Sequence, residues 1–83
     1  MIFLLEPDKL SITQKKVLMV LGKHENEYLT TDQISKESGV NPHHVKLAIY
    51  KFMDSDWVFI DSTGYKEKVG VSPNGSSAYR DIR

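Results

Sequence analysis

The chain has 83 residues, which is enough for one small domain near the lower size limit for folding without disulfides or metals. It contains no cysteine, which excludes a disulfide framework, a thiolate metal site and a cysteine nucleophile, and is compatible with a cytoplasmic location. Eleven basic residues balance eleven acidic ones, so bulk charge gives no support for a nucleic-acid partner. Any basic surface must therefore come from local placement, and we expect a single domain over residues 1–83.

The chain opens with an N-terminal apolar segment, residues 1–10, that includes Ile2, Phe3, Leu4 and Leu5. This apolar run is too short for a signal peptide or a membrane span. The sequence leaves three roles open for it. It adds a strand to a hairpin, packs on the last helix, or pairs with a second copy across a two-fold axis.

A first helix is predicted from Ile12 to Lys23. Ser11 with Gln14 three residues later forms a capping-box pattern at its start. A shared inward side is predicted for Val17, Val20, Leu21 and His24. Residues 24–28, HENEY, break the pattern and are expected to form a polar loop.

The next two helices meet at a tight turn. Thr30 with Gln33 repeats the capping box and predicts a second helix that ends at Gly39, where a residue without Cβ adopts the left-handed conformation freely. Asn41 and Pro42 then restart a helix, because Asn is a good N-cap and Pro fits the first helical position. A stop and a restart two residues apart predict a helix-turn-helix.

The third helix is predicted from Pro42 to about Ser55 and has two contrasting faces. One face is apolar at helical spacing and is expected to enter the core: Val45, Ala48, Ile49, Phe52 and Met53. The opposite face is mixed and mostly polar: His43, His44, Lys46, Leu47, Tyr50 and Lys51.

After Asp56 the pattern becomes that of a β-hairpin, from about Trp57 to Ser72. Residues 57–61 are aromatic and β-branched, Gly64 marks a turn, and residues 66–72 read as the return strand. Trp57 is expected to cap the core. Residues 72–75, SPNG, punctuate the chain, and residues 76–83 are expected to make a last helical turn or two.

Three stretches carry a resemblance to a known family: ITQKKVLMVL, LTTDQISKESGVNPHHVKLAIYKFMDSDWV and VSPNGSSAYRDI. Together they resemble the winged helix-turn-helix transcriptional regulators, most closely the core of the MarR and PadR groups. The resemblance implies an α+β winged helix, in which a three-helix bundle is followed by a hairpin wing and a short C-terminal helix. The sequence departs from that pattern at Ser38, at Asp56, where the family often has glycine, and at Lys66 and Lys68, where many wings carry arginine.

The resemblance also implies a function. A small cytoplasmic regulator of this kind reads double-stranded DNA with its third helix in the major groove and its wing on the backbone or minor groove. A homodimer on a palindromic or repeated site is implied too, although the long flanking helices through which MarR-type proteins dimerise have no counterpart in these residues.

Candidate DNA contacts follow from side-chain chemistry, since donors recognise phosphates and base edges and an apolar group can contact a thymine methyl. On the third helix the candidates are Asn41, His43, His44, Lys46, Leu47, Tyr50 and Lys51. On the wing they are Thr63, Tyr65, Lys66 and Lys68. The start of the second helix, residues 30–33, could also face a phosphate, but Asp32 opposes this.

An alternative function remains open at this point. The zero net charge and the acidic series Asp54, Asp56 and Asp61 would also suit a winged-helix protein-interaction module that does not bind DNA. No metal site, cofactor or enzymatic activity is predicted. The adjacent His43 and His44 point about 100° apart on a helix, and no nucleophile-base arrangement is present.

Overall fold

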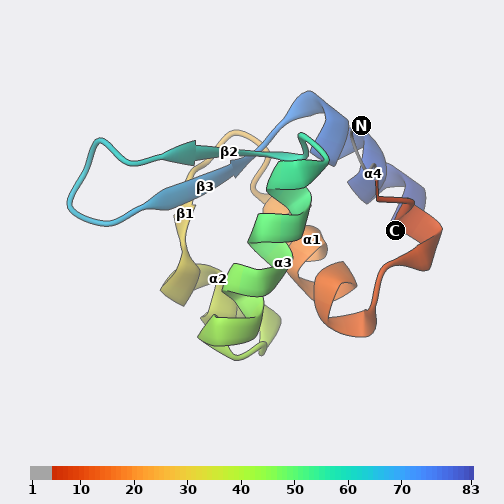
Figure 1. Ribbon diagram of the computed structural model, residues 1–83, viewed down its shortest axis with the longest axis horizontal. Helices are drawn as coiled ribbons and strands as arrows, with labels where there is room; N and C mark the ends of the chain where they lie inside the picture. Colours follow the sequence, from red (N-terminus) through yellow and green to blue (C-terminus); the bar gives the residue numbers. More distant parts are fainter. Residues whose placement is uncertain (1–4) are drawn as a thin grey trace.

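The computed structural model describes residues 5–83, and Ile2, Phe3 and Leu4 of the apolar opening lie outside them. Three helices precede a hairpin that leads into a fourth helix (Figure 1). The elements are a 3-10 turn η1 (Pro7–Lys9), α1 (Ile12–Lys23), β1 (Leu29–Thr30), α2 (Thr31–Ser38), α3 (Pro42–Asp54), β2 (Val58–Asp61), β3 (Lys68–Val71) and α4 (Pro73–Ile82). No helix within residues 5–83 is long and apolar enough to cross a membrane.

The predicted starts of α1 and α2 are confirmed by complete capping boxes. The Gln14 backbone N–H donates to the Ser11 hydroxyl at 3.1 Å, and the Ser11 N–H donates back to the Gln14 side-chain oxygen at 3.0 Å. Thr30 and Gln33 repeat this exchange at the start of α2, at 3.2 and 2.8 Å. Two otherwise unpaired backbone donors are satisfied at each helix start, so purely local chemistry positions both helices.

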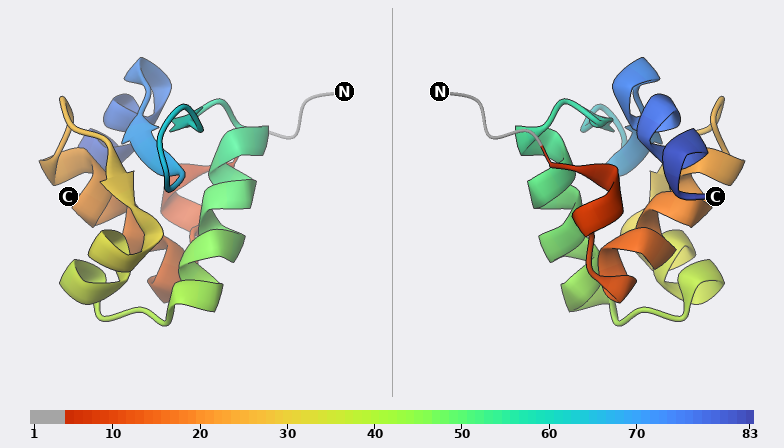
Figure 2. Two further views of the ribbon diagram at one scale, coloured as in Figure 1. Left: turned by 90° about the vertical axis from the view of Figure 1, so that its left-hand side faces the viewer. Right: turned by 90° about the vertical axis from the view of Figure 1, so that its right-hand side faces the viewer.

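The turn between α2 and α3 has the predicted geometry, and Figure 2 shows it as a short link between the two helices. Gly39 is left-handed at φ 74°, and the side-chain oxygen of Asn41 accepts the His43 N–H at 2.8 Å. Ser38 stands where the family has an apolar residue, and its hydroxyl accepts the Val40 N–H at 3.1 Å. The departure at Ser38 therefore supplies a hydrogen bond inside the turn.

A three-stranded antiparallel sheet has the order β1-β3-β2. Val58 lies opposite Val71, and Leu29 lies opposite Val69. The sequence did not predict β1, because two residues are too few to show an alternating pattern. The return strand was predicted from residue 66 but begins at Lys68, so Lys66 and Glu67 belong to the connection at the tip.

The chain passes from α3 into β2 through Asp56, which adopts a left-handed conformation at φ 57°. This is the position where the family often has glycine, and aspartate is one of the few other residues that tolerate it. The turn brings the Trp57 N–H to the Phe52 carbonyl at 2.9 Å and the two rings to a centroid distance of 5.4 Å. Trp57 is buried, as predicted.

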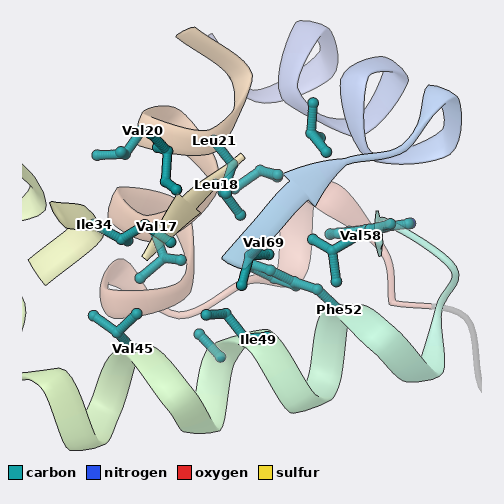
Figure 3. Packing of buried hydrophobic residues seen from close by; sticks show 14 of the residues in the cluster. Val17, Leu18, Val20, Leu21, Ile34, Val45, Ile49, Phe52, Val58 and Val69 are labelled. Atoms are coloured by element: carbon teal, nitrogen blue, oxygen red, sulfur yellow. The ribbon is translucent and has the colours of Figure 1, made fainter. Parts of the chain in front are cut away.

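The core lies between α1, α2, α3 and one face of the sheet (Figure 3). From α3, the side chains of Val45, Ile49 and Phe52 point toward α1, Ile34 and Val69. Two predictions of inward placement are wrong. Met53 is 42% exposed. The prediction failed because periodicity identifies the face of a helix but not how far along the helix its packing partner extends. His24 follows the last turn of α1 as its C-cap and is partly exposed.

The C-terminal helix begins at Pro73, earlier than the predicted residues 76–83. Ser72 is its N-cap and accepts the Gly75 N–H at 3.1 Å, so SPNG starts a helix in the same way that Asn41-Pro42 does. Packing requires glycine at two contacts of this helix. A Cβ on Gly75 would meet the Trp57 carbonyl oxygen at 2.1 Å, and one on Gly22 of α1 would meet the Tyr79 ring at the same distance.

Candidate nucleic-acid interface

The polar face of α3 is solvent-exposed over the length of the helix. We call it the α3 outer face, made of His43, His44, Lys46, Leu47, Tyr50 and Lys51, all of which are exposed. Leu47 and Tyr50 are 49% and 59% exposed, and they lie next to each other on the same surface as the polar side chains. The predicted α3 candidates are thus brought together on one accessible surface, and Asn41 lies at its N-terminal edge.

Asn41 has a structural role as well as an exposed position. Its side-chain oxygen is occupied by the His43 N–H in the cap. The amide NH₂ of such a side chain still has two donors for an external acceptor.

Two grooves flank the α3 outer face, and Tyr50 borders both. The first, the wing groove, has a volume of about 380 Å³ and runs between α3, the start of α2 and the hairpin. Its lining includes apolar Ile49, Met53, Ile60 and Val69 and charged Asp32, Lys46, Lys66 and Glu67. The second has a volume of about 390 Å³ and lies between α3 and the start of α1; its lining includes Gln14, His44, Leu47 and Lys51.

The hairpin connection, residues 62–67, projects away from the helices (Figure 1). Tyr65 is fully exposed on it. Thr63 is oriented by Asp61, whose Oδ1 accepts the Thr63 backbone N–H at 3.0 Å and its hydroxyl at 2.6 Å. These bonds from Thr63, with a smaller contribution from the Lys68 charge, lower the pKa of Asp61. Lys68 itself lies in β3 opposite Asp61, at the base of the connection and away from its tip.

One ion pair crosses the wing groove. The Lys66 ammonium nitrogen lies 3.6 Å from a carboxylate oxygen of Asp32, in the first turn of α2. Both side chains are about two-thirds exposed. Sequence reasoning considered both residues but did not predict this contact, since 34 positions separate them and no local pattern links them.

His24 forms a separate cluster beyond the α3 outer face. Its Nδ1 lies 2.7 Å from Glu27, and its Nε2 lies 3.0 Å from Glu37 of α2. Hydrogen bonds first to Glu37 and then to Glu27 raise the pKa of His24 above its ordinary value of 6.5. The two carboxylates bind opposite ring nitrogens, so they cannot converge with the imidazole on one ion. No group of three potential metal ligands occurs in the described part of the chain.

Comparison with known proteins gives matches to solved structures alone. No protein-family model and no curated protein matches the sequence. The solved structures are of MepR, a transcription regulator of the Staphylococcus aureus multidrug efflux pump MepA, at a TM-score of 0.78 and 14% identity over 90% of this chain. A complex of S. aureus MepR with DNA matches at a TM-score of 0.74 and 16% identity over 88% of the chain. This chain has the winged-helix fold.

The predicted α+β winged helix is therefore confirmed, with β1 as an additional strand and a longer α4. The chain spans only 56% of the length of MepR in the first match and 61% in the DNA complex. At these identities the likeness establishes the fold, while function must be argued from the surface of this chain.

Proposed function

We propose that this protein is a small DNA-binding transcriptional regulator that reads double-stranded DNA with α3 in the major groove. The observation that carries the proposal is the α3 outer face, which presents donors, a leucine and a tyrosine together on an exposed helix of a winged-helix fold. The match to a MepR–DNA complex supports this function over the alternative of an interaction module.

The proposed roles follow the position of each side chain. Near the N-terminal end of α3, Asn41, His43, His44 and Lys46 would approach base edges, and Leu47 would contact a thymine methyl. Tyr50 and Lys51, farther along, would bind the backbone. On the wing, Tyr65 and Lys66 would follow the backbone or minor groove, with Thr63 beside them and Lys68 at the base.

We further propose that residues 1–83 act as a single domain in the cytoplasm and that two copies bind a palindromic or repeated site. A two-fold protein matches a site whose halves are one helical turn apart. We assign the protein no enzymatic activity, metal or cofactor, since its proposed work is recognition alone.

The test is a selection of DNA ligands from random sequence, followed by affinity measurements at several salt concentrations. Replacing Lys46 and Lys51 by alanine should weaken binding and lower the slope of log K against log salt by about one unit, because each lost phosphate contact lowers it by about one and Lys51 is the phosphate contact of the pair. Replacing Lys9 and Lys23 is the matched control, since it removes the same charge outside α3 and the wing. Equal effects of the two pairs, or no selected sequence, would contradict the proposal.

A further inference from the structure

The wing groove contains charges of both signs, although its position beside α3 suits a DNA backbone. Lys46 and Lys66 border it, but so do Asp32 and Glu67. Asp32 lies within 3.6 Å of the Lys66 ammonium. The wing cation nearest the groove therefore already has an anionic partner within the protein.

We propose that Asp32 is a negative determinant of DNA affinity, which engages Lys66 in the free protein and repels phosphate in the bound one. This inference rests on the proposed function and adds to it a residue that sets the affinity for DNA. A phosphate entering the wing groove must take Lys66 from Asp32, and it then lies close to an unpaired carboxylate. Both effects oppose binding, whatever the DNA sequence.

The position of Asp32 suits such a role. Asp32 lies in the first turn of α2, where the helix dipole favours an acidic side chain. Both side chains of the pair remain about two-thirds exposed, which makes the contact weak enough for a phosphate to displace it. The pair can therefore reduce affinity without preventing binding.

The consequence concerns the affinity for DNA of any sequence. Contacts to phosphate supply most of the sequence-independent affinity of DNA-binding proteins. A residue that weakens those contacts leaves a larger share of the binding free energy to base contacts from α3. Because a selected and an unrelated duplex lose this phosphate affinity alike, Asp32 lowers the affinity for all DNA and leaves the ratio of specific to non-specific affinity unchanged.

The experiment compares Asp32→Asn with Glu25→Gln. Glu25 is an exposed acid beside a separate hollow formed with α4, so its replacement makes the same change in net charge away from the wing groove. Dissociation constants are measured for a selected site and an unrelated duplex at several salt concentrations. We expect Asp32→Asn to tighten binding to both duplexes by up to about fivefold, the upper end of what one exposed charge pair contributes, and Glu25→Gln to change it by less than about twofold.

A double-mutant cycle with Lys66→Gln tests the contact itself. The increase in DNA affinity from Asp32→Asn should be smaller when Lys66 is also replaced, because only the repulsion between Asp32 and the DNA phosphate is then removed. An equal gain with and without Lys66 would overturn the part assigned to the ion pair. Equal effects of Asp32→Asn and Glu25→Gln would overturn the whole inference and leave the proposed function intact.

Failure of the proposed function has a different signature. If the wild-type protein and all variants are folded by circular dichroism but bind no DNA at low salt, the proposed function is wrong, and this inference falls with it.

Discussion

The two faces of α3 share thirteen residues but differ in what determines them. The inward face, with Val45, Ala48, Ile49 and Phe52, is buried against α1, α2 and the sheet. The outer face has no packing partner in the described part of the chain, yet it includes Leu47 and Tyr50. Core packing explains every residue of the first face and none of the second. The difference teaches that stability and recognition can be altered separately on this one helix.

The largest expected effect is on the inward face. Phe52 is fully buried, and Phe52→Ala should lower the free energy of unfolding by about 3–5 kcal/mol through lost burial and a cavity. Leu47→Ala on the outer face is the matched control and should cost less than about 1 kcal/mol while weakening DNA binding. Urea denaturation measures both. A large stability loss from Leu47→Ala would show that the outer face also belongs to the core.

A medium effect of opposite sign is expected where α3 ends and the chain turns into β2. Asp56 has φ 57°, so Asp56→Gly should raise the free energy of unfolding by about 1 kcal/mol by relieving steric strain. The variant keeps the hydrogen bond from the backbone N–H of residue 56 to the Met53 carbonyl oxygen. Asp54→Gly, at the last residue of α3, should instead lower it by about 0.3 kcal/mol, the difference in helix propensity between aspartate and glycine. The same sign for both would show that left-handed strain at Asp56 is negligible.

The smallest effect is a pH dependence that belongs to neither face of α3. Hydrogen bonds to Glu37 and Glu27 raise the pKa of His24 above 6.5, so folding favours the protonated ring. The resulting stabilisation is fully present below pH 6.5 and is lost as pH rises through the raised pKa. The melting temperature of the wild-type protein should therefore exceed that of His24→Gln by more at pH 6 than at pH 8.

The control for this measurement is the replacement of His43 and His44 on the outer face by glutamine, which should leave that difference in place. The role assigned to His24 would be contradicted if the control variant lost the advantage over His24→Gln at pH 6, or if the wild-type protein showed no such advantage.

Much of the fold could be predicted from local signals. The capping boxes at Ser11 and Thr30, the left-handed Gly39 and the Asn41-Pro42 restart each act within a few residues, so the bounds of α1, α2 and α3 were readable within about one residue. The same chemistry at Ser72-Pro73 marks the start of α4, but it was interpreted as punctuation. That miss came from interpretation, because the signal was present.

The candidate site divides in the same way. Exposure of the α3 outer face follows from helical periodicity, which separates the two faces before any packing is known. The ion pair of Lys66 with Asp32 and the position of Lys68 at the base of the hairpin connection depend on where the wing folds back. No sequence pattern specifies where the wing folds back, so the charges that line the wing groove could be identified only from the structure.

The sequence by itself determined the helices, the sharp turn between α2 and α3 and the two-sided character of α3, because caps, glycine conformation and periodicity act over a few residues. Only the tertiary structure decided that β1 pairs with β3, that Met53 extends beyond the core, and that Asp32 meets Lys66. The two contacts join residues far apart in the chain, and they, like the extent of the core along α3, are fixed by how the whole core closes.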